Sequence, residues 1–173
     1  MRVITAPEIF TSKENDICCF LAGGITNCPD WQKDVIDNLG DRCDISEDGS
    51  IILFNPRREN FPIGDKSEAY KQIGWEFDQL ERMDIFSMYF SSGDSDQPIC
   101  MYELGRNILR IQMRFPTDWE KRIIITADKD YMRYRDVIIQ TELATNGKIC
   151  VWDNLHDHCD SIIRAFKYIK YHR

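Results

Sequence analysis

The order of hydrophobic segments constrains the fold of this chain more than any other feature. Five apolar runs have the length of β-strands, and longer segments with the three- and four-residue spacing of α-helices alternate with them. This alternation is typical of βα units that build a parallel sheet with helices on both faces. We therefore predict an α/β fold with a mainly parallel, five-stranded sheet, and we expect residues 1–173 to form a single domain.

The expected strands cover residues 16–21, 51–54, 84–90, 122–127 and 148–152. The expected helices cover about 29–39, 67–83, 99–115, 134–145 and a closing segment that ends at residue 171. In the second of these helices, three- and four-residue steps predict one stripe that faces the core, formed by Tyr70, Ile73, Phe77 and Leu80.

Composition argues against two classes of partner. The formal net charge is −7 and the 22 basic residues form no long run, so we expect no nucleic acid to bind. The longest apolar runs are far shorter than the roughly 20 residues of a membrane-spanning helix, so we expect no membrane partner. The first residues lack the pattern of a secretory signal, which predicts a cytoplasmic protein.

The sequence predicts neither a metal ion nor a cofactor. No two of the seven cysteines have the close spacing of zinc ligands, although Cys150, His156, His158 and Cys159 lie near one another in sequence. The segment after the first expected strand matches neither a dinucleotide-binding fingerprint nor a phosphate-binding P-loop.

In an open parallel sheet, ligands bind outside the carboxyl ends of the strands. This rule selects the loops after the expected strands as the place to look for chemistry. Gly23 and Gly24 follow the first strand, and without a Cβ atom they allow a ligand to approach the backbone closely. The alternative for this pair is a simple tight turn.

Two glutamates are candidates for acid–base or covalent chemistry. Glu103 falls in the first turns of an expected helix, where the helix dipole favours the ionised form that a nucleophile needs. Glu76 follows Trp75, and an apolar neighbour raises the pKa of a carboxyl group. One ionised and one protonated carboxyl group can cleave a glycosidic bond through a covalent intermediate. The alternative for Glu103 is a glutamate near a helix start whose only role is electrostatic, and the alternative for Glu76 is a solvated surface charge.

The chain resembles the nucleoside 2-deoxyribosyltransferase-like proteins in several short motifs that occur in order. They are FLAGGI (20–25), WQ (31–32), NPRR (55–58), QIGWE (72–76), MDIF (83–86), QPI (97–99), ELG (103–105) and DYMRYRDV (130–137). The resemblance implies a doubly wound, flavodoxin-like domain of three layers. It also implies a glutamate that attacks the anomeric carbon of a deoxynucleoside and expels the base.

By its place in the ELG motif, Glu103 is the nucleophile that the resemblance implies, and Glu76 is the acid that assists departure of the base. A second base or water then takes the sugar from the enzyme. The resemblance further implies a homo-oligomer with sites near subunit interfaces. The substrate-binding residues we predict are Gly23, Gly24, Ile25, Trp31, Asn55, Arg57, Asp94, Asp96, Gln97 and Asp136.

The chain departs from the family pattern at two of these positions. Gln97 stands six residues before Glu103, where related enzymes often hold the sugar hydroxyl with Asp or Ser, and Asp94 or Asp96 is the substitute we consider. Asp136 stands where the family places an Asn-bearing segment that reaches a neighbouring subunit.

Other side chains are candidates for contacts with the phosphate or the base. Arg57 and Arg58 either bind a substrate phosphate or are solvated charges. The aromatic residues considered for stacking on a base are Phe20, Trp31 and Phe61.

Three functions are compatible with these residues. The first is a nucleoside or nucleotide deoxyribosyltransferase or N-glycosidase. The second is a protein that binds a nucleotide or a nucleotide signal without turnover, because a fold can keep its pocket and lose its chemistry. The third is a structural subunit without a small ligand.

Overall fold

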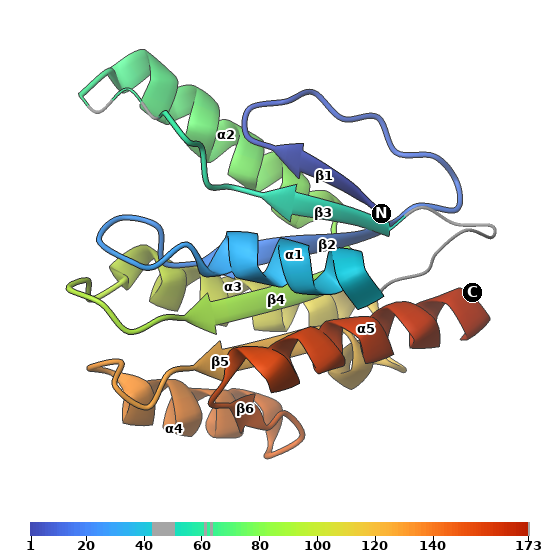
Figure 1. The fold of residues 1–173 in the computed structure, drawn as a ribbon. Helices are drawn as coiled ribbons and strands as arrows, with labels where there is room; N and C mark the ends of the chain where they lie inside the picture. The colour runs from blue at the N-terminus through green and yellow to red at the C-terminus, as the bar shows by residue number, and fades with distance from the viewer. Residues whose placement is uncertain (43–50, 61, 63, 173) are drawn as a thin grey trace.

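A computed structural model describes residues 1–42, 51–60, 62 and 64–172 of the chain. Its centre is a parallel sheet with the strand order β1-β3-β2-β4-β5-β6 (Figure 1). The strands are β1 (Arg2–Thr5), β2 (Ile17–Gly23), β3 (Ile51–Asn55), β4 (Ile85–Phe90), β5 (Ile123–Ala127) and β6 (Val151–Trp152). The α/β class and the parallel sheet are therefore confirmed.

The predicted number of five strands was wrong, because the described part of the chain contains six. The additional strand is β1, which pairs with β3 from Arg2 opposite Ile52 to Thr5 opposite Asn55. It lies at the edge of the sheet, and its four residues are too few to show a clear hydrophobic period. The strand expected over 148–152 is shorter than predicted, because only Val151 and Trp152 pair with β5.

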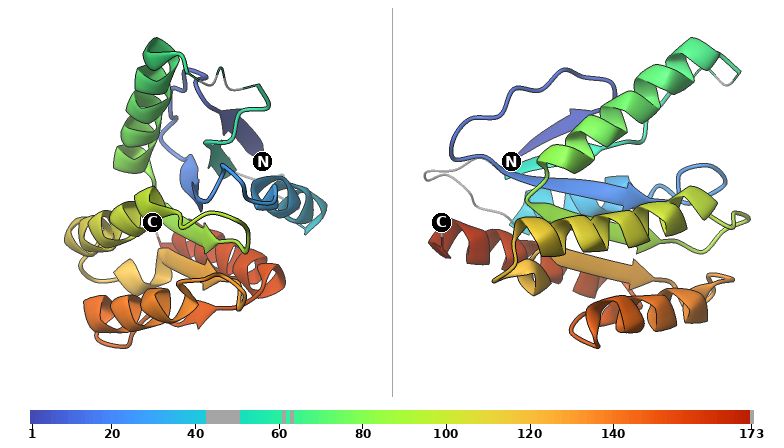
Figure 2. Two further views of the ribbon diagram at one scale, coloured as in Figure 1. Left: turned by 90° about the vertical axis from the view of Figure 1, so that its left-hand side faces the viewer. Right: turned by 180° about the vertical axis from the view of Figure 1, so that it is seen from behind.

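Helices cover both faces of the sheet, as the left view of Figure 2 shows from one end. They are α1 (Trp31–Arg42), α2 (Lys66–Arg82), α3 (Pro98–Arg114), α4 (Tyr134–Thr145) and α5 (Leu155–His172). Helices α1 and α5 pack on one face and bury an apolar cluster that includes Val35, Leu53 and Ile162. Helices α2, α3 and α4 pack on the other face, around Phe20, Phe86 and other large side chains. This layering agrees with a flavodoxin-like fold.

Helix α2 presents a different side to the sheet than the sequence predicted. Of the expected stripe only Leu80 is buried, whereas Tyr70, Ile73 and Phe77 are 82%, 65% and 48% exposed. The buried positions of α2 are instead Gln72, Trp75, Gln79 and Leu80. Trp75 and Leu80 on this side belong to the apolar cluster under the helix. Gln72 is accommodated beside them because its Nε2 donates a hydrogen bond to the carbonyl oxygen of Pro56, at 2.7 Å.

The connections place a crevice between β2 and β4. From β2 the chain crosses through α1 to β3 on one side, and it later reaches β4 on the other side of β2. Such a switch in direction opens a crevice at the carboxyl ends of the two strands. Strand β2 ends at Gly23, which pairs with Tyr89 of β4, so the crevice is expected just beyond this pair.

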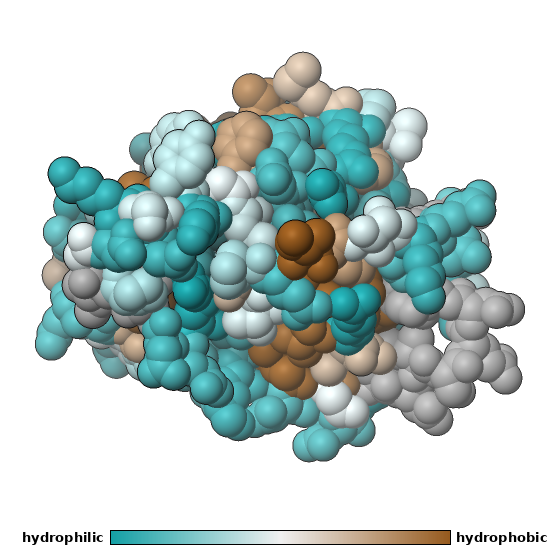
Figure 3. Space-filling view, turned by 90° about the horizontal axis from the view of Figure 1, so that it is seen from above, coloured by the Kyte–Doolittle hydropathy of each residue, from teal (hydrophilic) through white to brown (hydrophobic). Residues whose placement is uncertain are grey.

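No helix in the described part of the chain is long and apolar enough to cross a membrane. Seen from above, the surface is mostly hydrophilic, with small hydrophobic patches (Figure 3). The residues considered for zinc do not converge within the described ranges: His158 is buried between Ser87 and Thr126, whereas Cys150 is exposed.

Candidate active site

A cavity of about 240 Å³ opens at the carboxyl ends of β2 and β4. Glu76 from α2 and Glu103 from α3 both line it, so two helices bring the two candidate catalytic carboxyl groups to one space. The remaining lining residues are Phe20, Ala22, Gly23, Gly24, Ile25, Thr26, Pro56, Ser95, Gln97, Pro98, Ile99 and Cys100. Of the predicted substrate-binding residues, this cavity contains Gly23, Gly24, Ile25 and Gln97.

Two glycines are required where the backbone of β2 enters the cavity wall. Gly23 has a φ of +151°, and a Cβ atom there would overlap the carbonyl oxygen of Tyr89 and lie 2.6 Å from the ring of Trp31. A Cβ atom on Gly24 would lie 2.5 Å from Sγ of Cys28 and 2.6 Å from Cδ of Gln97. The glycine pair therefore permits dense packing behind the cavity.

Gln97 is the residue that precedes α3, and it holds a left-handed backbone conformation with a φ of 47°. Its side chain is 4% exposed, and its Nε2 donates a hydrogen bond to the carbonyl oxygen of Ser91 at 2.8 Å. Its Oε1 is buried and has no partner within the described residues. An unpaired acceptor on a cavity wall is costly unless a ligand donates to it.

Burial dominates the electrostatics of Glu103. Desolvation in the cavity and then the charge of Glu76 raise the pKa of Glu103 from 4.5 to about 7, while Arg106 opposes the shift. This result differs from the expectation that the helix dipole keeps Glu103 ionised. Glu103 is the sixth residue of α3, which is beyond the first turn where the dipole acts strongly.

Burial also raises the pKa of Glu76, as the sequence predicted, and a hydrogen bond from Gln72 opposes this shift. Nε2 of Gln72 donates a hydrogen bond to Oε1 of Glu76 at 2.7 Å, and this bond favours the ionised form. The indole of Trp75 points elsewhere and donates to the carbonyl oxygen of Glu8 at 2.8 Å. Without a ligand, both carboxyl groups therefore hold a proton to a higher pH than a solvated glutamate does, because burial raises the pKa of each.

Trp31 supports the cavity from behind. It is 2% exposed, stacks on Tyr89 with ring centres 5.0 Å apart, and donates a hydrogen bond from Nε1 to the carbonyl oxygen of Gly24 at 3.0 Å. This position does not support the prediction that Trp31 stacks on a base. Phe20 does line the cavity, and Phe61 lies outside the described residues.

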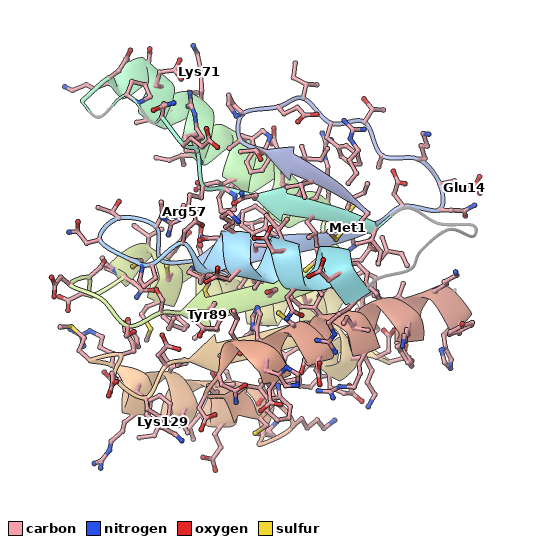
Figure 4. The ribbon with its side chains drawn as sticks, in the orientation of Figure 1. Met1, Glu14, Arg57, Lys71, Tyr89 and Lys129 are labelled. Atoms are coloured by element: carbon pink, nitrogen blue, oxygen red, sulfur yellow. The ribbon has the colours of Figure 1, made fainter. Side chains whose placement is uncertain are left out.

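Arg57 anchors the loop between β2 and α1. Its guanidinium group donates hydrogen bonds to Oε1 of Gln32 at 2.9 Å and to the carbonyl oxygen of Pro29 at 2.7 Å. It also contacts the carbonyl oxygens of Gly24 and Cys28, and Figure 4 shows Arg57 beside this loop. Arg58 is likewise engaged, in an ion pair with Glu68.

The loop after β4 is held by side chains from outside the cavity. The carboxylate of Asp128 accepts hydrogen bonds from the hydroxyl group of Tyr89 at 2.6 Å and from the backbone N–H of Ser92 at 2.7 Å. The hydroxyl group of Tyr131 donates to the carbonyl oxygen of Asp96 at 2.8 Å. The side chains of Asp94 and Asp96 are not part of the cavity lining.

Asn55 and Arg57 line a neighbouring cavity of about 740 Å³, which shares Ile25 with the first one. Oδ1 of Asn55 accepts a hydrogen bond from the backbone N–H of Arg57 at 3.0 Å. Asp136 lies apart from both cavities, exposed at the start of α4 and paired with Arg133.

Ser95 and Cys100 also line the cavity, and neither was among the predicted site residues. Cys100 comes two residues after Pro98, the first residue of α3, and Ser95 accepts a hydrogen bond from the backbone N–H of Gln97. Ser95 lies in the loop before α3 and Cys100 in its first turn, close in sequence to Gln97 and Glu103. This closeness is the signal that could have identified them as site residues.

A family model described as "Nucleoside 2-deoxyribosyltransferase like" matches residues 17–115, which include both glutamates and the loops around them. The chain belongs to this family. Membership supports a nucleoside deoxyribosyltransferase-like function and nucleosides as small-molecule substrates. A comparison with curated proteins gave no match.

Proposed function

We propose that the protein is a nucleoside 2-deoxyribosyltransferase or N-glycosidase that works through a covalent glycosyl-glutamate intermediate. The observation that carries the proposal is the position of two partly buried carboxyl groups, Glu76 and Glu103, in one cavity at the switch point of the sheet. Raised pKa values keep a proton in the site near neutral pH, as acid–base chemistry requires.

In the proposed first step, the carboxylate of Glu103 forms a bond to C1′ of the deoxyribose. The bond between C1′ and the base nitrogen breaks, and its electron pair leaves with the base, which takes a proton from Glu76. In the second step, Glu76 removes a proton from an incoming base or from water, and that nucleophile displaces Glu103 from C1′. The products are a new nucleoside or free deoxyribose.

The electrostatic coupling between Glu76 and Glu103 suits these two reaction steps. The charge of Glu76 raises the pKa of Glu103, so a proton on Glu76 lowers it and favours the ionised nucleophile. One proton shared by the pair thus gives both required forms at once: a protonated acid and a carboxylate. We infer that substrate binding selects the arrangement with the proton on Glu76.

The lining of the cavity favours an uncharged nucleoside over a monophosphate. Two carboxyl groups and no Lys or Arg side chain lie among the described residues of the lining, and a phosphate there would be repelled. Arg57 and Arg58, the cations nearest in sequence to the cavity residue Pro56, already have partners. We propose that the unpaired Oε1 of Gln97 accepts a hydrogen bond from a sugar hydroxyl or a base amine.

The decisive experiment follows base release from a panel of deoxynucleosides and their monophosphates, with and without an acceptor base, by chromatography. We expect turnover that disappears in Glu103→Ala and a covalent sugar adduct, detected by mass spectrometry, when no acceptor is present. Asp78→Asn, at an exposed acid of α2 outside the cavity lining, is the matched control and should keep the wild-type rate. Ligand binding without turnover in the wild-type protein would refute the enzyme and favour a nucleotide-binding protein.

We also propose that copies of the chain associate through α2 and α3 beside the cavity. Tyr70, Ile73, Ile99 and Tyr102 are all more than 60% exposed on these helices, and an exposed apolar surface near a site is typical of an interface. Light scattering tests the assembly: we expect a mass of at least two chains, and a smaller mass for Ile73→Glu. A monomeric wild-type protein would contradict this proposal.

A further inference from the structure

A second cavity, of about 310 Å³, lies wholly outside the residues that match the family model. It forms at the edge of the sheet because β6 has only two residues and pairs only with Ile125 and Thr126 of β5. The preceding residues Ile123 and Ile124 instead line the cavity. It is therefore located toward the amino end of β5, away from the carboxyl ends of the strands where Glu76 and Glu103 lie.

Three cations and one carboxylate line this cavity, although the chain as a whole is acidic. The cations are Lys121 from the 3₁₀ helix η1 (Trp119–Lys121), Lys148 from the loop before β6, and Arg164 from α5. Within the described residues, none of the three lies in salt-bridge distance of a carboxylate. Nζ of Lys148 lies 5.5 Å from the centre of the Trp119 ring, and the lining holds one acid, Glu120, against the three cations.

Aromatic and aliphatic side chains complete the cavity. Trp152 and Tyr168 are partly exposed in its wall, and Ile149 and Ala165 are buried in its floor. The guanidinium carbon of Arg164 lies 5.7 Å from the centre of the Trp152 ring. Nη2 of Arg164 donates a hydrogen bond to Oγ of Ser161 at 2.8 Å, which fixes the side chain at the cavity.

We propose that this cavity is a second ligand site, which binds a small aromatic anion. Trp152 offers a flat apolar surface to a planar ring, and Tyr168, whose ring stacks on His172, completes the wall beside it. Arg164 with the two lysines offers donors to a phosphate or carboxylate group. The volume is in the range of small-molecule sites. This proposal is independent of the reaction at Glu103, because no residue is shared between the two cavities.

Calorimetric titration of the full chain tests the site with four probes: AMP, adenosine, benzoate and inorganic phosphate. We expect saturable binding of AMP or benzoate. Tighter binding of AMP would identify phosphate as the preferred anionic group, and tighter binding of benzoate would identify carboxylate. Arg164→Gln should weaken binding about tenfold, because a charge-assisted hydrogen bond is lost. Lys167→Gln, an exposed residue of α5 outside the lining, should leave the affinity unchanged.

Two further variants locate the bound probe. Glu103→Gln should not change the affinity, since that residue lies in the other cavity. Quenching of tryptophan fluorescence on binding should disappear in Trp152→Phe. The proposal is overturned if neither AMP nor benzoate binds, if adenosine binds as tightly as AMP, or if Lys167→Gln weakens binding as much as Arg164→Gln does. A loss of binding in Glu103→Gln would also overturn it, by placing the probe in the first cavity.

Discussion

Replacing Glu103 by Gln should stabilise the folded protein, and the size of the effect should depend on pH. Burial and the charge of Glu76 raise the pKa of Glu103 from 4.5 to about 7 in the folded state. Below pH 4.5 the carboxyl group is protonated in both states, so it carries no penalty. As the pH rises from 4.5 to 7 the unfolded chain ionises first, and stability is lost.

The magnitude follows from the pKa shift. At 1.36 kcal/mol per pKa unit, the shift of Glu103 corresponds to about 3 kcal/mol of stability that the wild-type protein has lost at pH 8. Glutamine has nearly the same shape and no charge, so Glu103→Gln should recover most of this free energy at pH 8 and almost none at pH 4.5. A functional site that reduces stability is common in enzymes.

Urea unfolding of the wild-type protein and the variant at pH 4.5, 6 and 8 measures this difference. Glu142→Gln, on the exposed surface of α4, is the matched control, and its stability should follow the wild type at every pH. A free energy of unfolding for Glu103→Gln that equals the wild-type value at pH 8 would refute the reasoning, because Glu103 would then ionise as a solvated group does.

Three other substitutions test how the cavity is built. Gly24→Ala should abolish ligand binding measured by calorimetry, because its Cβ displaces the buried side chain of Gln97. Arg57→Ala should lower both the melting temperature and the turnover rate, because the loop before α1 loses its anchor, whereas Lys33→Ala on the surface of α1 should change neither. Tyr89→Phe should cost about 1.5–3 kcal/mol of unfolding free energy in urea, since its hydroxyl group donates to the carboxylate of Asp128.

The sequence was sufficient to predict the elements that have strong hydrophobic patterns. Strands such as β4 are buried on both faces, so their apolar runs are continuous. The pairing of Glu76 with Glu103 came from the resemblance to a family and not from the order of the strands. Strand β1 escaped prediction because its only partner is β3, and four residues at a sheet edge carry little pattern. Strand β1 forms because it pairs with β3, which lies far along the chain, and the local sequence of β1 carries no sign of this pairing.

Polar residues in buried positions explain the larger errors. Hydrophobic spacing predicted that Ile73 and Phe77 face the sheet, but Gln72 and Gln79 take the buried side of α2. Gln72 can do so because the carbonyl oxygen of Pro56 and the carboxylate of Glu76 accept its hydrogen bonds. Packing of α2 against the loop after β3 brings the carbonyl oxygen of Pro56 to Gln72, and the spacing of apolar residues along α2 does not reveal this contact.

The side chains that hold the loops beside the cavity should influence the pKa of Glu103. Arg57 holds the loop after β2 and Asp128 holds the loop after β4, and both act from outside the cavity that contains the two glutamates. Burial is the largest cause of the raised pKa of Glu103, and we infer that these two loops contribute to it, because they border the cavity. Loosening either loop should therefore hydrate Glu103 and lower its pKa toward 4.5. The same variants should then lose stability from the broken anchor and regain part of it at pH 8, because the penalty for ionising Glu103 becomes smaller.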